Sequence, residues 1–134
     1  MRIRSDPLDR LFSECIRRRA MKRVGGCERC LTPKYDIEKE DGEIFPAWRQ
    51  LDCAHLLGRW KKSIRWDEDN AAGVCGGCHM VLDRDHQEKE NFINSHLGPE
   101  RYDLLKGRER IPGMPDRAAI GLYLKAEIKE MEMR

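Results

Sequence analysis

Six cysteines stand in this chain of 134 residues, and four of them form two Cys-x-x-Cys pairs. The first pair is Cys27 and Cys30, and the second is Cys75 and Cys78. Structural zinc sites use four soft or borderline ligands in a tetrahedron, and two such pairs supply four thiolates from two chain segments. Two pairs with this internal spacing favour a metal site over a redox pair. The sequence therefore predicts a structural zinc ion that joins the two segments.

Carboxylate and imidazole side chains lie between and just beyond the two cysteine pairs. Asp52 and His55 fall within the 44 intervening residues, whereas His79 follows the last cysteine directly and Asp83 stands four residues further on. Residues four apart on a helix share one face, so His79 and Asp83 can bind one ion. Such ligands suit a catalytic metal with an open coordination position. We therefore expect Asp52 to complete a second, divalent-metal site, with His55 beside it as a base.

Each of these side chains also has a structural interpretation. A single histidine is more often a surface or core residue than a catalyst. Asp83 belongs to a charged cluster, and Asn70 ends the run Asp-Glu-Asp-Asn, where turn residues are common. We interpret His86 as a reserve ligand on the same helix face as His79, and His96 as a packing residue. The position of His55 midway between the cysteine pairs favours the catalytic interpretation for that residue, whereas Asn70 is equally open to either interpretation.

A basic segment precedes the first cysteine pair. Residues 2–23 contain eight Lys or Arg against three Asp or Glu, a net charge of +5, while the whole chain carries +2. Apolar residues recur at helical spacing over 5–23, which predicts a helix with Pro7 in its first turn. Lys and Arg clusters gain affinity for polyanions by releasing counterions from phosphates, although a solvated helix face shows the same pattern. The candidate nucleic-acid contacts on this helix are Arg17, Arg18 and Arg19.

The remaining elements follow from hydrophobic periodicity and from turn residues. We expect a loop or irregular hairpin over 34–44, strands over 48–57 and 71–75, a helix that begins near Cys78, a helix that Gly98-Pro99 stops, a helix over 99–106 and a last helix over 116–132. This order predicts an α+β fold, with a small zinc-stapled core and flanking helices.

A loop rich in basic and aromatic residues joins the two central strands. Its candidate DNA contacts are Arg59, Lys61 and Lys62. Arg59 and Arg65 are candidates to clamp a phosphate, and an ordinary surface role is equally open to them. Trp60 and Trp66 suit either stacking on unpaired bases or a place in the core.

Length and composition limit the chain to one small domain. Charged residues make up 37% of it and hydrophobic residues 40%, which allows a thin core under a densely charged surface. We expect one domain over 1–134, divided into a basic helix (1–24), a zinc-stapled core (25–98) and C-terminal helices (99–134). The chain has no apolar run of the roughly 18 residues that a membrane span needs and no secretory signal at its N-terminus. We therefore expect a cytoplasmic protein without a membrane partner.

Three segments that carry these residues resemble the ββα-metal motif of HNH (His-Me finger) endonucleases, set between zinc knuckles. They are Asp52-Cys-Ala-His55, Arg65-Trp-Asp-Glu-Asp-Asn70 and Cys75-Gly-Gly-Cys78-His79. Within that superfamily the chain is most similar to phage recombination endonucleases of the NinG/Rap type, and the similarity covers roughly residues 9–110. The knuckle arrangement is also similar to that of the endonuclease VII group, which resolves Holliday junctions.

The resemblance implies roles for individual residues. His55 matches the general base, Asn70 the asparagine that braces the loop, and His79 the metal ligand at the start of the helix. Ala54 stands where many relatives carry a ligand, so Asp52, on the same side of the strand, is the expected substitute. NinG-like sequences usually carry Asn at the position of His79, and imidazole shifts the preference towards Mn²⁺, Ni²⁺ or Zn²⁺ without excluding Mg²⁺. We expect Mg²⁺ or Mn²⁺ as the catalytic ion.

The function implied by the resemblance is metal-dependent cleavage of branched DNA, such as Holliday junctions, D-loops and flaps, by a phage or prophage enzyme in a bacterial cell. The products would carry 5′-phosphate and 3′-hydroxyl ends. Two alternatives stay open: a sequence-specific HNH endonuclease of restriction, homing or packaging type, and a zinc-ribbon module that binds DNA without cutting it. The last helix carries an apolar stripe that suits packing on the domain or a dimer interface. Because resolving a junction needs two cuts, we expect a homodimer.

Overall fold

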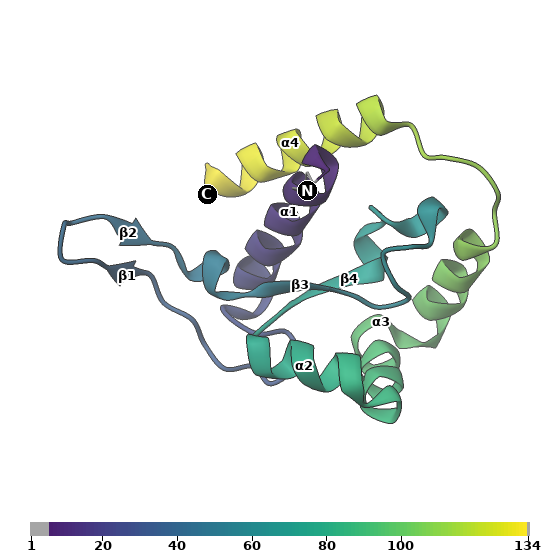
Figure 1. Cartoon of the computed structure of the whole chain (residues 1–134), viewed down its shortest axis with the longest axis horizontal. Coiled ribbons are helices and arrows are strands. Elements are labelled where there is room, and N and C mark those ends of the chain that lie inside the picture. Colours follow the sequence, from purple (N-terminus) through teal and green to yellow (C-terminus); the bar gives the residue numbers. More distant parts are fainter. Residues whose placement is uncertain (1–5, 134) are drawn as a thin grey trace, which may run out of the picture.

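The computed structural model describes residues 6–133 of the chain (Figure 1). Within this part, four α-helices combine with two two-stranded antiparallel sheets, so the predicted α+β class is confirmed. None of the helices in this range has the length and apolar character needed to cross a membrane. The predicted start of the first helix at residue 5, and the part of the basic segment before residue 6, lie outside the described residues.

The first helix, α1 (Pro7–Val24), packs against the central strand pair and the last helix (Figure 1). The Asp6 carboxylate caps it by accepting a hydrogen bond from the Leu8 N–H at 2.9 Å. Gly25 ends it in the left-handed conformation with φ 68°, which glycine adopts without steric penalty. Its buried face runs through Phe12 and Ile16, as the helical spacing predicted.

The centre of the fold is a strand pair followed by a helix. Strand β3 (Asp52–His55) pairs antiparallel with β4 (Ala71–Val74), and α2 (Gly76–Arg84) starts two residues after β4 ends. The predicted strand over 48–57 is too long, because η1 (Ala47–Gln50) forms a 3-10 turn in which the Leu51 N–H donates to the Trp48 carbonyl at 3.2 Å. The loop between the strands contains two further 3-10 turns, η2 (Lys62–Ile64) and η3 (Glu68–Asn70).

Helix α3 (His86–Glu109) is bent at Gly98, whose φ of 79° is not helical. This break confirms the predicted separation at Gly98-Pro99. The expectation that His86 shares a helix face with His79 is wrong, because Asp85 has extended dihedrals, ends α2 and caps α3. The reserve ligand therefore lies on a different helix from the predicted metal site.

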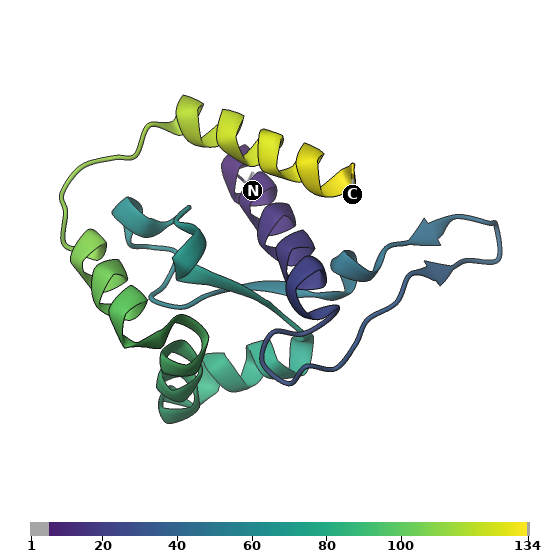
Figure 2. The same cartoon turned by 180° about the vertical axis from the view of Figure 1, so that it is seen from behind.

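The predicted hairpin between the first cysteine pair and β3 is present. Strands β1 (Ile37–Glu38) and β2 (Ile44–Phe45) pair antiparallel, and both views show them projecting from the body of the molecule (Figures 1 and 2). Two contacts hold the base of the hairpin. The Ala47 N–H donates to the Asp36 carboxylate at 2.8 Å, and the Gln50 amide donates to the Tyr35 carbonyl at 2.7 Å.

Helix α4 (Arg117–Glu132) lies along α1 (Figures 1 and 2). Leu124 and Ile128 are buried in one cluster with Phe12 and Ile16 of α1. The other two residues of the predicted stripe, Ile120 and Met131, are partly buried against the same cluster. The stripe therefore packs within the chain, which removes it as a surface for the expected homodimer.

Strand β4 approaches α1 so closely that residue 73 has no room for a side chain. A Cβ atom on Gly73 would lie 2.6 Å from the Ala20 Cβ and 3.3 Å from the Ile16 carbonyl oxygen. We expect Gly73→Ala to lower the free energy of unfolding by about 1–3 kcal/mol, because α1 must move away from the strand. Urea denaturation of the zinc-loaded protein measures this change.

Gly107 provides the matched control for that substitution. It lies within α3, and a Cβ there would meet nothing within 4 Å. Gly107→Ala should raise stability by about 0.5–1 kcal/mol through helix propensity. Equal stability of the Gly73→Ala and parent proteins would show that α1 and β4 are not in close contact.

Candidate functional site

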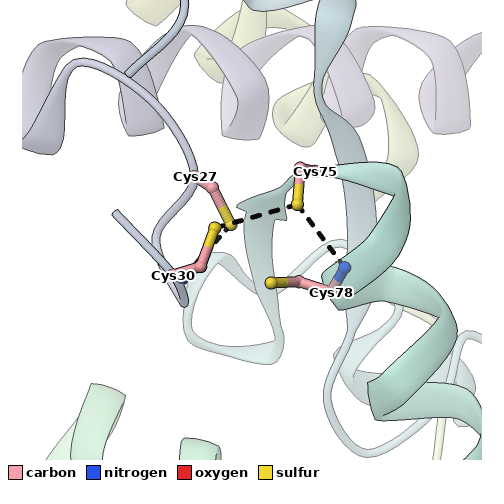
Figure 3. A group of neighbouring side chains, drawn as sticks. All are labelled: Cys27, Cys30, Cys75 and Cys78. Atoms are coloured by element: carbon pink, nitrogen blue, oxygen red, sulfur yellow. Dashed lines mark hydrogen bonds between the residues drawn. The ribbon is translucent and has the colours of Figure 1, made fainter. Parts of the chain in front are cut away.

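The two cysteine pairs meet at one end of the strand pair (Figure 3). Cys27 and Cys30 lie on the turn after α1, while Cys75 caps α2 and Cys78 lies in its first turn. Their four sulfur atoms are all within 4.8 Å of one another. Zn–S bonds of about 2.3 Å in a tetrahedron place sulfur atoms roughly 3.8 Å apart. The Cys30 and Cys75 sulfurs are 3.9 Å apart, so the cluster could hold a structural metal such as zinc.

Hydrogen-bond donors surround these sulfur atoms. In each pair the second backbone N–H donates to the first sulfur, at 3.4 Å for Cys30 to Cys27 and 3.5 Å for Cys78 to Cys75. The Arg29 guanidinium donates to the Cys78 sulfur at 3.4 Å and so adds positive charge beside the cluster. Hydrogen bonds from Thr32 lower the pKa of Cys30 to about 6, whereas burial raises the pKa of Cys78 to about 12. A metal ion bound by all four sulfurs would favour the thiolate form of Cys78, since the thiolate is the form of cysteine that binds metals.

The three predicted ligands of the catalytic metal lie side by side. The Asp52 carboxylate, from the start of β3, is 3.0 Å from Nδ1 of His79 in the first turn of α2. Asp83 approaches the other ring nitrogen, with 3.7 Å between its Oδ2 and Nε2. The two carboxylates thus contact opposite nitrogens of one imidazole. All three side chains were expected to converge on one point, and they do not. Helical spacing places Asp83 on the same face of α2 as His79, but it does not determine which ring nitrogen the carboxylate contacts.

The Asp52 carboxylate and the His79 ring contact each other directly, and within residues 6–133 the side chains gathered closely enough to hold a metal ion are the four cysteines rather than these predicted ligands. Neighbouring ligands of an octahedral ion with bonds of about 2.1 Å lie roughly 3.0 Å apart. The oxygen–nitrogen distance of this pair is 3.0 Å. Histidines that bind metals commonly donate their other ring N–H to a carboxylate, which is where Asp83 stands. Among the predicted ligands, Asp52 and His79 are the better-placed pair.

His55 lies at the end of β3, half-buried against the Phe12 ring, with 5.6 Å between the ring centroids. Its Nε2 is 3.0 Å from the backbone carbonyl oxygen of Arg65. Because a carbonyl only accepts hydrogen bonds, Nε2 must carry the hydrogen, and Nδ1 of the neutral ring keeps its lone pair. Burial lowers the pKa of His55 below its usual value of 6.5. The ring is therefore neutral at pH 7 and able to accept a proton at Nδ1.

Asn70 is fully buried and fixes the loop between the central strands. Its Oδ1 accepts a hydrogen bond from the Leu57 N–H at 2.7 Å. Its Nδ2 donates to the carbonyls of Gly58 at 3.3 Å and Ile64 at 3.1 Å. These bonds tie the start of the loop to the turn that precedes Arg65. Asn70 thus positions the carbonyl that orients His55.

The phosphate-clamp candidates in the loop are engaged by a residue that the sequence analysis did not single out. Asp9 of α1 accepts hydrogen bonds from Arg59 at 2.8 Å, from Arg65 Nε at 2.9 Å and from the Trp66 indole at 2.9 Å. The Arg65 backbone carbonyl therefore accepts the hydrogen bond from His55, while the Arg65 guanidinium fastens the loop to α1 through Asp9. Trp66 belongs to the core, whereas Trp60 is 82% exposed.

The predicted DNA contacts on α1 have different surroundings. Arg19 is a structural residue that donates to the carbonyls of Glu68 at 2.9 Å and Ala71 at 2.8 Å. Arg18 pairs with Glu14 at 3.0 Å and with Glu132 at 3.1 Å. Arg17 donates through Nε to the Ser13 carbonyl at 3.1 Å. In the loop, Lys61 pairs with Glu109 at 3.2 Å and Lys62 is exposed.

An open groove of about 870 Å³ runs over β3 between α1, η1, the loop and α2. The proposed base and metal ligands line it together with two residues at its η1 end: His55, Asp52, His79, Asp83, Arg17 and Trp48. The groove therefore joins imidazole, carboxylate and cationic side chains in one open space. No protein-family model, curated protein or solved structure matches this chain.

Proposed function

We propose that the chain is a metal-dependent DNA endonuclease with an HNH (ββα-metal) core. The observation that carries the proposal is that one groove contains His55, whose Nε2 is held by the Arg65 carbonyl, and an Asp52–His79 pair whose nearest oxygen and nitrogen are 3.0 Å apart. The order of β3, β4 and α2, with a cysteine cluster beside it, agrees with the core that the resemblance implies.

In the proposed reaction, Nδ1 of His55 takes a proton from a water molecule, and the water oxygen attacks the scissile phosphorus. The Arg65 carbonyl continues to accept the Nε2–H as the ring becomes positively charged. The negative end of the carbonyl dipole therefore stabilises the imidazolium. The bond from phosphorus to the 3′-oxygen breaks, and the departing oxygen takes a proton from solvent water, which leaves 5′-phosphate and 3′-hydroxyl ends. A divalent ion on Asp52 and His79 would stabilise negative charge on the phosphoryl and leaving oxygens.

The decisive test is a cleavage assay that compares the zinc-loaded parent protein with the His55→Ala variant under the same conditions. Labelled four-way junction, D-loop, flap and linear duplex DNA are incubated with Mg²⁺, with Mn²⁺ and without added metal. We expect metal-dependent cutting of the branched substrates by the parent protein alone. Cutting of linear duplex at one discrete site would instead select a sequence-specific HNH enzyme. Binding without cutting in every metal would leave a DNA-binding zinc module.

The biological setting is part of the same proposal. Branched recombination intermediates of a phage or prophage, in the cytoplasm of a bacterial host, are the substrates that the resemblance implies. Two copies of the chain would make the two cuts across a junction. The apolar stripe of α4 packs on α1 of its own chain, so a different surface would join the copies. Light scattering of the protein with and without a four-way junction tests this point, and one copy per junction would contradict it.

The two carboxylates on His79 should differ in their effect on metal activation. Asp52→Asn removes a proposed ligand, and we expect the Mn²⁺ concentration for half-maximal cleavage to rise by about 100-fold or more. Asp83→Asn removes only the partner of the other ring nitrogen, with an expected rise of about 10-fold. Asp103→Asn, on the outside of α3, is the control because its residue lies outside the groove. A larger effect of Asp83→Asn would assign the ligand role to that residue instead.

The rate of cleavage should depend on the protonation of His55. Burial lowers the pKa of this ring below 6.5, and the base works only when neutral, so kcat/KM should reach its plateau at a lower pH than an ordinary histidine base would give. As the pH falls through the lowered pKa, kcat/KM should drop about tenfold per pH unit. The measurement is made at saturating Mn²⁺, with zinc content followed at each pH. A rate that keeps rising well above pH 7 would exclude His55 as the titrating base.

A further inference from the structure

We propose that Trp48 and the guanidinium groups of Arg17 and Arg49 form a binding subsite for backbone phosphates of a nucleic-acid strand, at the η1 end of the groove. The inference rests on the proposed function, because it concerns the strand that the groove would cut. Trp48 lines the groove together with both arginines. The guanidinium carbon of Arg17 lies 4.8 Å from the centroid of the indole ring system, and that of Arg49 lies 5.6 Å away. Both distances are within the range of cation–π attraction.

The backbone holds this tryptophan in a fixed place. η1 is anchored to the base of the hairpin by the Ala47 and Gln50 hydrogen bonds at 2.8 and 2.7 Å. On its other side Leu51 is almost completely buried, and β3 starts at the next residue. Trp48 is therefore fixed four residues before the proposed metal ligand Asp52. A strand bound at Trp48 would continue along β3 towards His55.

The arginines beside Trp48 differ in whether a carboxylate forms an ion pair with them. Arg18 also packs on Trp48, at 4.7 Å, but carboxylates of Glu14 and Glu132 neutralise it. No carboxylate within residues 6–133 forms an ion pair with Arg17 or Arg49. Arg49 repels the Arg17 guanidinium, while the nearby carboxylates of Glu14 and Asp52 attract it more strongly. An anion between the two guanidinium groups would relieve that repulsion.

The chemistry of a guanidinium beside an aromatic ring identifies the ligand. A guanidinium attracted to an aromatic ring can still use its N–H groups for hydrogen bonds. The Arg17 Nε is used by the Ser13 carbonyl, which leaves the terminal nitrogens for an anion. Paired N–H donors in this geometry match phosphate oxygens. We therefore assign Trp48 as a positioning residue and Arg17 and Arg49 as the phosphate-binding residues.

The test measures binding without cleavage. His55→Ala protein, loaded with zinc and kept in Ca²⁺, is titrated into a labelled 20-nucleotide DNA strand and into the corresponding duplex, at several KCl concentrations. We expect Arg17→Gln and Arg49→Gln each to weaken single-strand binding by about 5- to 20-fold and to reduce the slope of log K against log[KCl] by about 0.7. Arg110→Gln, an exposed arginine outside the groove, is the matched control and should change neither quantity.

The role of Trp48 needs a readout other than loss of charge. Trp48→Ala should weaken binding as much as one arginine substitution, although it removes no charge, and Trp48→Phe should restore most of the affinity. Zinc content and circular dichroism show whether each variant is folded. Parent-like binding by folded Trp48→Ala, or an equal loss in Arg110→Gln, would overturn the subsite.

The binding assay also separates this inference from the proposed function. Losses in the groove variants alone, together with a parent protein that cuts no DNA, would support the subsite and refute the nuclease. Cleavage by the parent protein with unchanged binding by the variants would refute the subsite and leave the nuclease in place.

Discussion

Cys30→Ser is expected to abolish metal binding and cooperative folding of the chain. Cys30 is exposed, so serine removes a ligand without removing core packing. Structural zinc contributes about 10–16 kcal/mol of apparent binding free energy in small zinc domains, whereas a whole domain is stable by only about 5–15 kcal/mol. Loss of the ion therefore removes an amount of free energy comparable to the whole free energy of unfolding of the domain. Native mass spectrometry should show one zinc per parent chain and none in the variant.

Cys53→Ser is the matched control, because Cys53 is a cysteine outside the cluster. It should keep one zinc ion and a cooperative urea transition. A folded Cys30→Ser protein without metal, with the same unfolding midpoint as the parent, would show that the cluster has no structural role. Chelation of the parent protein, followed by circular dichroism, tests the same point without a substitution.

Features set by short-range chemistry were predicted from the sequence. The two cysteine pairs have ligand spacing within four residues, and each pair places a backbone N–H on its first sulfur. The start of α1 after Asp6 and the break at Gly98 follow from side-chain capping and from a backbone angle that glycine adopts readily. Local rules were therefore sufficient for these helix ends and for the geometry within each cysteine pair, whereas the meeting of the two pairs is a contact across 45 residues.

The contacts that organise the groove depend on residues far apart in the sequence. Asp9 resembles any acidic residue in the first turn of a helix, yet its partners Arg59 and Arg65 lie 50 and 56 residues away. Arg19 belongs to a basic run that indicates a surface, but its guanidinium binds two carbonyls beside β4. Periodicity gives the face of a helix but not the element that covers it, so these roles could not be assigned before the fold was known.

The secondary structure around Trp48 could not be predicted from the sequence either. The segment 48–57 was expected to form a strand, and a strand would turn this side chain to one face of the sheet. In the structure the 3-10 turn of η1 instead places it against the arginines of α1. Its proximity to Arg17 is a tertiary contact, and no local motif predicts it.

His55→Ala is expected to reduce the rate constant for DNA cleavage by about 10²–10⁴-fold while leaving DNA affinity within about twofold. The reason is that Nδ1 is the free, unprotonated nitrogen of a ring whose other nitrogen is fixed on the Arg65 carbonyl. His86→Ala, on the exposed start of α3, is the matched control and should cut like the parent. Single-turnover cleavage at saturating metal measures the chemical step, and fluorescence anisotropy in Ca²⁺ measures binding.

Addition of free imidazole separates loss of the base from loss of structure. Truncation of His55 opens space beside Phe12 at the wall of the groove, and a neutral imidazole that enters it can accept the same proton. We expect partial recovery of cleavage that grows with imidazole concentration and follows the neutral fraction of the added base. Wild-type cleavage by His55→Ala would exclude His55 as the base. A rate that metal alone restores, with no response to imidazole, would assign the proton transfer to metal-bound solvent.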